Sequence, residues 1–196
     1  KNAIDDERFT LIEANFRDLK RYLKLYGIKR LNGVLADFGV SSHQFDAEKR
    51  GFSIRFDGPL DMRMDQEGTL DATDVVNRYS IDALTAILKN YGEVKGAYRV
   101  AEQIIAAREE SKIETTQALI AVLKPLIPER FLNKTLAQVF QAIRIEVNQE
   151  LEVIKTFLLQ SGELLVKDGR LVCIAYHSLE DRLVKRYIRE GVFEGQ

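Results

Sequence analysis

Several features that would direct a protein to a particular compartment or chemistry are scarce in this chain of 196 residues. It has one cysteine, Cys173, so a disulfide framework or a cysteine-based metal site is excluded. No apolar run approaches the roughly 18 residues of a membrane span, and the sequence shows no signal peptide. We therefore expect a cytoplasmic location with no membrane association and no bound metal, and we expect Cys173 to be a small core residue.

The chain also lacks an excess of charge of either sign. The chain has 29 Lys and Arg against 30 Asp and Glu, a formal net charge of -1. This balance excludes a global attraction to nucleic acid or to an anionic membrane, so any contact with RNA needs a local basic surface. The sequence has no Gly-x-Ser-x-Gly elbow, which argues against a serine hydrolase.

What the chain does have is a buried strand that leads into a long loop. Val34-Leu35-Ala36 is followed by Asp37 and then by about 30 residues rich in Gly, Ser and Asp. Aromatic and long apolar side chains are interleaved through this loop, which indicates that it is ordered. An acid delivered by a strand into a structured loop is typical of sites at the carboxyl ends of parallel strands.

Hydrophobic periodicity predicts the remaining elements. Strands are expected over 9–14, 33–37 and 170–176, with a turn at 167–169. Helices are expected over 15–26, 71–78, 80–91, 93–110, 115–126, 133–166 and 178–190. This order predicts an α/β fold with a mostly parallel sheet, in which residues 1–66 and 144–196 form the core and 67–143 form an inserted helical domain.

Five motifs carry a resemblance to a known family. They are Asp37-Phe-Gly-Val-Ser-Ser-His-Gln44, Arg50-Gly-Phe-Ser53, Asp57-Gly-Pro-Leu-Asp-Met-Arg-Met-Asp65, Phe140-Gln-Ala-Ile-Arg-Ile145 and His177-Ser-Leu-Glu-Asp-Arg182. In this order they resemble the RsmH (MraW) family of S-adenosylmethionine-dependent methyltransferases, which act on the exocyclic N(4) amine of a cytidine in 16S, small-subunit, ribosomal RNA. The resemblance implies a Rossmann-like class I methyltransferase core with an inserted all-helical domain.

The resemblance also implies roles for single residues. It places Asp37, Gln44 and Phe16 at the cofactor, S-adenosylmethionine. A carboxylate is attracted to the positive sulfonium, and an aromatic wall suits adenine. The residues themselves leave plainer alternatives open, because Phe16 could simply begin the apolar stripe of a helix and Asp37 could be a cap.

The transfer itself calls for hydrogen-bond acceptors, because the amine lone pair is delocalised into the pyrimidine ring. Asp37, Ser41 and Ser42 are candidate acceptors, and His177 is expected in the cleft at the end of a strand, although a lone histidine is more often structural. The target base must leave its stack, so an aromatic-lined pocket is expected. Its candidate walls are Phe38, Phe45, Phe52 and Phe56.

Candidate contacts to RNA fall in two places. Asp61 and Arg63 lie in the long loop, where they could contact substrate or merely form an ion pair that stiffens the loop. Arg182, Lys185, Arg186 and Arg189 recur at helical spacing and form a basic face that could hold phosphates, the alternative being an ordinary solvated face. Ser178 is expected as the N-cap of that helix.

One departure from the family concerns the cofactor. The family opens with a Gly-rich loop that approaches the cofactor, yet no Gly-x-Gly occurs in this sequence. We therefore expect a fragment that lacks this loop and the C-terminal end. A non-catalytic RNA-binding or assembly module and a methyltransferase for a small molecule or protein stay open as alternatives. Pairing of an exposed sheet edge with a second copy, which would give a homodimer, stays open too.

Overall fold

The structure is a computed structural model that describes residues 4–41 and 50–193. The chain forms two compact units. We call Lys1–Phe38 with Leu151–Gln196 the α/β unit, and Gly39–Glu150 the helical unit. The domain boundaries predicted from the sequence, 66/67 and 143/144, stay a prediction.

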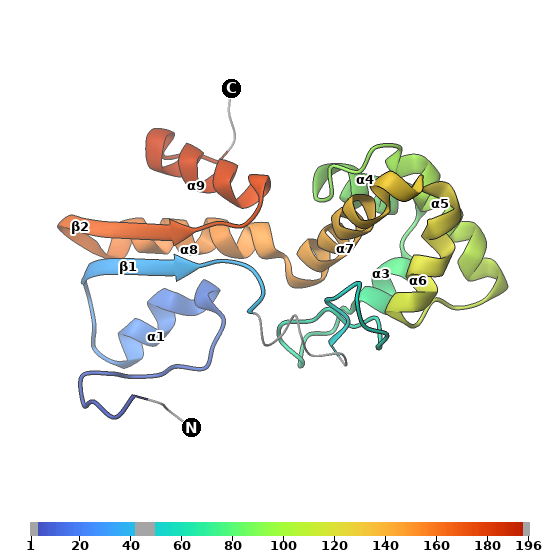
Figure 1. The fold of residues 1–196 in the computed structure, drawn as a ribbon. Coiled ribbons are helices and arrows are strands. Elements are labelled where there is room, and N and C mark those ends of the chain that lie inside the picture. The colour runs from blue at the N-terminus through green and yellow to red at the C-terminus, as the bar shows by residue number, and fades with distance from the viewer. Residues whose placement is uncertain (1–3, 42–49, 194–196) are drawn as a thin grey trace. The chain divides into compact units, whose positions relative to one another are not determined.

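The α/β unit is built on two parallel strands (Figure 1). Its elements are η1 (Phe16–Asp18), α1 (Leu19–Leu25), β1 (Leu31–Asp37), α8 (Glu150–Leu164), β2 (Leu165–Ile174) and α9 (Ser178–Glu190). The register pairs Val34 with Leu171 and Asp37 with Ile174. The expected parallel pairing is thus confirmed, and both strands end at the same edge.

One face of this two-stranded sheet carries the core of the unit. Val34, Ala36, Leu171 and Cys173 pack against the buried residues of α8 and α9, among them Phe157 and Val184. Burial raises the pKa of the Cys173 thiol, as expected for a small core residue. The opposite face is open: Leu35 is 71% exposed and Val172 is 51% exposed. The expectation that Val34-Leu35-Ala36 is a buried strand is therefore wrong, because among the described residues only one face of the sheet is covered.

The strand predicted over 9–14 is wrong. The structure has no strand there, and Phe9 and Leu11 are 41% and 61% exposed. A strand is stable only when its backbone hydrogen bonds to a neighbour, and none of the described residues pairs with this segment. The helix predicted to follow is confirmed as η1 and α1, with the side chain of Asn15 accepting a hydrogen bond from the Arg17 N–H.

Two expectations near β2 and α9 also need correction. The predicted turn at 167–169 lies inside β2, where Asp168 adopts a positive φ of 65°. The register with β1 passes from Leu165 directly to Arg170, so the Asp-Gly forms an irregularity within β2 where the sequence predicts a turn. The N-cap of α9 is His177 rather than Ser178, which is the first helical residue.

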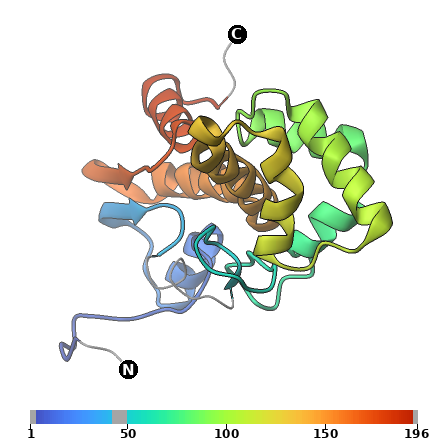
Figure 2. The same ribbon diagram turned by 45° about the vertical axis from the view of Figure 1, so that its right-hand side comes forward.

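The helical unit contains the remaining helices. They are α3 (Ala72–Arg78), α4 (Ile81–Asn90), α5 (Ala97–Glu110), α6 (Thr116–Leu123), η3 (Lys124–Leu126), η4 (Glu129–Phe131) and α7 (Leu132–Asn148). Helix α4 packs against α5 and α7, and α5 also packs against α6 (Figure 2). Asp71, Ser80 and Thr115 cap the starts of α3, α4 and α6 with their side chains. Within residues 4–41 and 50–193, no helix is both long and apolar enough to cross a bilayer.

The long helical period of 133–166 is realised as two helices. Gln149 has a φ of 50°, and this left-handed residue ends α7 before α8 begins. Close to the break, Arg144 donates two hydrogen bonds to the carboxylate of Glu150, at 2.8 and 3.0 Å. Both side chains are largely buried, so the pair fixes the backbone at the end of the helical unit.

The described part of the long loop is ordered, as expected. Met62 is fully buried and has a φ of 59°. The side-chain amide of Asn148 donates to the Met62 carbonyl at 2.8 Å, and its oxygen accepts from the Met64 N–H at 2.7 Å. At Gly51, with a φ of 71°, a Cβ atom would collide with the Pro59 carbonyl oxygen, so only glycine fits there. The loop is thereby fastened to α7.

Candidate active site

The carboxyl ends of β1 and β2 bring a carboxylate and a phenol together. Asp37 is the last residue of β1 and is exposed. The N–H of Phe38 donates to the Ile174 carbonyl at 3.1 Å, which holds the two strand ends side by side. The hydroxyl of Tyr176, two residues beyond Ile174, lies near enough to the Asp37 carboxylate to interact with it. This interaction and the charge of Asp37 raise the pKa of Tyr176 above its ordinary value of 10.0.

A buried carboxylate anchors the segment that carries Tyr176. Glu180, in the first turn of α9, is completely buried. One of its oxygens accepts a hydrogen bond from the Tyr176 N–H at 2.8 Å, and the other lies 3.2 Å from Nε2 of His177. Glu180 therefore fixes the backbone of Tyr176 and lies beside the ring of His177 at the strand end.

Three aromatic rings lie beneath this edge. Phe16 contacts Phe38 with ring centroids 5.9 Å apart and Phe157 with centroids 5.4 Å apart. Phe38 and Phe157 are almost completely buried, whereas Phe16 remains 40% exposed. Phe16 thus begins the apolar side of a helix and also offers part of its ring to a ligand.

The predicted site residues divide between the two units. Phe16, Asp37 and His177 belong to the α/β unit, and Asp37 and His177 are joined there through Tyr176 and Glu180. Ser41 is an exposed residue of the helical unit. Gln44, Ser42 and Phe45 lie outside the described residues.

Asp61 and Arg63 form an ion pair within the helical unit. Nε of Arg63 lies 2.8 Å from one carboxylate oxygen of Asp61, and Nη2 lies 2.8 Å from the other. The backbone N–H of Arg63 adds a third bond at 3.0 Å. Burial alone would raise the pKa of Asp61, but the hydrogen bonds and charge of Arg63 outweigh it and hold this pKa below its ordinary value. The pair is well placed to stiffen the loop.

The basic face of α9 is weaker than the sequence predicts. Lys185 pairs with Asp181 at 2.8 Å, and Arg189 pairs with Glu190. Arg186 donates to the Phe193 carbonyl at 2.9 Å. Acidic neighbours therefore offset part of the charge that the spacing of the basic residues indicates, while Arg182 lies exposed on the same helix.

Sequence reasoning missed two residues and misjudged two others. Tyr176 and Glu180 received no role, although strand alternation would have placed Tyr176 on the same face as Ile174 and Asp37. Phe38 and Phe52, considered as pocket walls, are core residues that are 2% and 5% exposed. Phe56 is 37% exposed and stays a candidate wall.

The chain resembles a set of known proteins along its full length. A model of the MraW methylase family matches residues 2–194. The "Ribosomal RNA small subunit methyltransferase H" proteins of Christiangramia forsetii and Flavobacterium johnsoniae are each 56% identical over 196 and 195 residues, which is 100% of this chain and 65% of each relative. The protein of the same name from Bacteroides fragilis strain YCH46 is 47% identical over 196 residues, 100% of this chain and 64% of that relative.

Together, the parallel strands, the acid at their carboxyl edge and these matches define an α/β protein of the Rossmann-like methyltransferase class with an inserted helical region. The chain belongs to the MraW methylase family. It spans about 65% of the length of the first curated relatives that it matches.

Proposed function

We propose that the protein containing this chain is an S-adenosylmethionine-dependent methyltransferase that methylates the exocyclic N(4) amine of a cytidine in small-subunit ribosomal RNA. Membership of the MraW methylase family is the observation that carries this proposal. The names of the relatives support the substrate class, and the acid at the end of β1 supports the chemistry. We also propose a cytoplasmic location and the ribosomal RNA or the small ribosomal subunit as partner.

The described residues fit the cofactor chemically. Asp37 presents an exposed carboxylate, which would attract the positive sulfonium, and Phe16 presents a partly exposed ring, which would lie against adenine. Gln44 is proposed from the family resemblance as a third contact. When bound, S-adenosylmethionine supplies the methyl group.

We assign Asp37 the central part in positioning the target amine. Its carboxylate would accept a hydrogen bond from an N–H of the cytidine amine, which favours the tetrahedral nitrogen required for attack. The Tyr176 hydroxyl interacts with that carboxylate and would limit the directions in which it turns. Orientation of this kind is a large part of the rate gain when two reactants are held in line.

Ser41 and His177 are proposed as further catalytic groups. Nδ1 of His177 is buried and has no hydrogen-bond partner among the described residues, while its Nε2 faces Glu180. His177 is proposed from the family resemblance, and it lies beside Glu180 at the end of β2. Asp61, Arg63, Arg182, Lys185 and Arg186 are proposed as contacts to RNA, and a homodimer as the assembly.

The experiment is methyl transfer from S-adenosylmethionine labelled in its methyl group. The substrates are small ribosomal subunits and naked ribosomal RNA from cells that lack this activity, and the nucleosides are identified by mass spectrometry. The proposal expects label in N(4)-methylcytidine, and Asp37→Asn should reduce the rate by about tenfold or more. Transfer to a protein or small molecule instead, or RNA binding without any transfer, would overturn it.

A further inference from the structure

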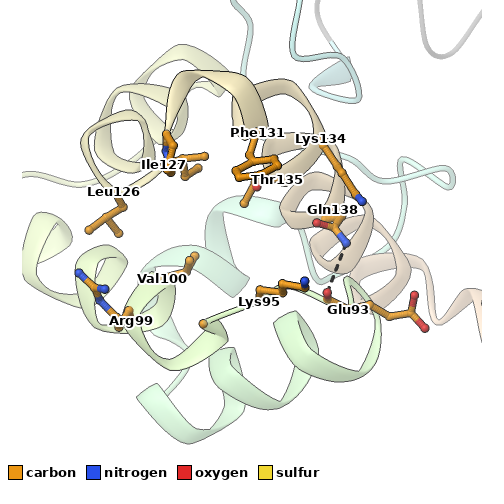
Figure 3. A pocket seen from close by; sticks show the side chains of 12 residues that line it. Glu93, Lys95, Arg99, Val100, Leu126, Ile127, Phe131, Lys134, Thr135 and Gln138 are labelled. Carbon is orange, nitrogen blue, oxygen red and sulfur yellow. Dashed lines mark hydrogen bonds between the residues drawn. The ribbon is translucent and has the colours of Figure 1, made fainter.

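A pocket of about 320 Å³ lies in the helical unit, and none of the residues assigned above lines it. It is formed between the start of α5, the η3–η4 segment and the first turns of α7. Its lining residues are Glu93, Lys95, Gly96, Arg99, Val100, Leu126, Ile127, Pro128, Phe131, Lys134, Thr135 and Gln138. Figure 3 shows Arg99 and Leu126 at one end of the opening and Lys134, Gln138 and Glu93 at the other.

Three cations line this pocket. Lys95 and Arg99 come from the start of α5, and Lys134 comes from α7. Within the described part of the chain, none of the three side chains makes an ion pair or a hydrogen bond. The one acid in the lining, Glu93, leaves a net charge of +2 (three cations minus one anion) in a chain whose formal net charge is -1. Unpaired like charges around one concave surface repel one another, so they favour an anion there.

The backbone adds to this positive field. Gly96 lines the pocket and is the N-cap of α5, with a φ of 72° and no side-chain capping bond. The N–H groups at the start of this 14-residue helix therefore lack a side-chain acceptor, and the positive end of its dipole lies at the pocket. Gly92 lets the segment before α5 lie close to α7, because a Cβ atom at this position would lie 2.6 Å from the Gln138 carbonyl oxygen.

The rest of the lining is apolar and includes an aromatic ring. Phe131 is 46% exposed, and the Arg130 guanidinium lies over its ring at 4.7 Å from the centroid. Val100, Ile127 and Pro128 complete the apolar part. A cationic rim beside an exposed ring and an apolar floor matches a ligand that joins an anion to a flat, weakly polar group. A nucleotide of a single-stranded RNA has this composition.

We propose that this pocket holds one nucleotide of single-stranded RNA, with its base against Phe131 and its two flanking phosphates held by Arg99 at one end and by Lys95 and Lys134 at the other. This proposal rests on the proposed function, which makes RNA the partner. The pocket then serves as an RNA-docking site on the helical unit, additional to the strand-end site where the target amine is positioned. The pocket also supplies a local basic surface, which a chain of balanced charge needs in order to bind RNA.

The first test compares two double variants of the complete natural protein. Arg99→Gln with Lys134→Gln removes two charges from the pocket, whereas Lys89→Gln with Lys112→Gln removes two exposed charges of the same unit that do not line it. Binding of a short fluorescent single-stranded RNA is followed by anisotropy at several salt concentrations. The pocket variant should weaken binding by about tenfold and reduce the slope of log K against log salt by about 0.7 for each phosphate that the protein no longer neutralises. Equal affinities and slopes for the two variants would overturn the proposal.

The second test addresses the base. Phe131→Leu keeps an apolar side chain but removes the ring, and it should weaken binding of the same RNA by about tenfold while leaving the salt slope unchanged. An RNA with abasic positions should bind the parent and Phe131→Leu with equal affinity. A variant that binds normal RNA as tightly as the parent would contradict the assignment of the base.

These outcomes are separate from those for the methyl transfer. Anisotropy requires no cofactor and no turnover, so a changed salt slope without any methylated product would support the pocket and refute the proposed function. Normal methyl transfer with unchanged RNA binding in the pocket variant would refute the pocket alone. Thermal unfolding of each variant verifies that the fold is kept.

Discussion

The hydroxyl of Tyr176 interacts with the carboxylate of Asp37 across the carboxyl ends of two paired parallel strands. The two residues are far apart in the sequence, and the register of β1 and β2 brings them together. Glu180 holds the backbone N–H of Tyr176 from the other side. Asp37, the proposed acceptor, therefore interacts with Tyr176, and the backbone of Tyr176 is held in turn by the fully buried Glu180.

This contact predicts the titration of Tyr176. Its pKa is raised in the folded protein, so the stabilisation from the contact is complete below pH 10 and is lost as the pH rises through the folded pKa. In Asp37→Asn, the pKa of Tyr176 should fall back towards 10.0. Ultraviolet absorbance of tyrosinate, measured as the difference from Tyr176→Phe in each background, reports this pKa. A Tyr176 pKa that is the same with Asp37 and with Asn would contradict the contact.

A second prediction concerns the role of Tyr176 in the cofactor site. Tyr176→Phe should weaken S-adenosylmethionine binding by about threefold to tenfold, because the Asp37 carboxylate loses the interaction that orients it. Tyr98→Phe is the matched control, since Tyr98 is an exposed residue of the helical unit. Calorimetric titration of the cofactor measures both variants, and equal affinities would show that Tyr176 has no positioning role.

Asn148 should be the main fastening of the long loop. Asn148→Ala removes the bonds to the Met62 carbonyl and the Met64 N–H, both part-buried, and should lower the free energy of unfolding by about 1–3 kcal/mol. Asn90→Ala, at the exposed end of α4, should change it by less than about 0.5 kcal/mol. Urea denaturation compares the two, and similar effects would contradict the assigned role.

The ion pair of Asp61 and Arg63 predicts a dependence on acid. The pKa of Asp61 is lowered from its usual 3.8, so the pair stabilises the fold above that pH, and this stabilisation is lost as the pH falls through the lowered pKa. The free energy of unfolding of Asp61→Asn should therefore fall less steeply below about pH 4 than that of the parent. Glu102 is exposed in α5 and has no ion pair among the described residues. The free energy of unfolding of Glu102→Gln should therefore fall with decreasing pH as steeply as that of the unsubstituted protein.

Gly162 and Tyr187 offer a coupled test of packing in the α/β unit. A Cβ atom on Gly162 would lie 2.5 Å from the Tyr187 hydroxyl oxygen and 3.7 Å from Cζ. The ring cannot easily move, because it stacks on Phe193 with centroids 5.1 Å apart. Gly162→Ala should thus destabilise the parent by about 1–2 kcal/mol. In a protein that already carries Tyr187→Phe, Gly162→Ala should raise the free energy of unfolding by up to about 1 kcal/mol, because alanine has the higher helix propensity. Denaturation of the four proteins measures the coupling, and purely additive effects would contradict it.

The sequence was sufficient where local chemistry decides the structure. Asn15, Asp71, Ser80 and Thr115 mark helix starts, and their side chains make the capping bonds. Local signals gave less where several elements meet. The Asp-Gly at 168–169 predicts a turn between elements, whereas the structure has an irregularity within β2 there. The break at Gln149 has no glycine or proline to announce it.

The same distinction applies to the site. Asp37 could be predicted because it ends an apolar strand, whereas placing Tyr176 beside it also needs the register of the two strands. The basic spacing in α9 was visible in the sequence, yet the acidic neighbours that offset part of it depend on side-chain geometry. The pocket beside Phe131 is assembled from three separate segments and had no sequence motif.

The most direct test of the central claim is a calorimetric titration of S-adenosylmethionine into the parent protein and into Asp37→Ala. The account predicts saturable binding by the parent near about 10 μM, which corresponds to about -7 kcal/mol, and binding at least tenfold weaker by the variant. Equal binding by both proteins would contradict the placement of the cofactor at Asp37. An absence of binding by the unsubstituted protein would contradict the proposed function.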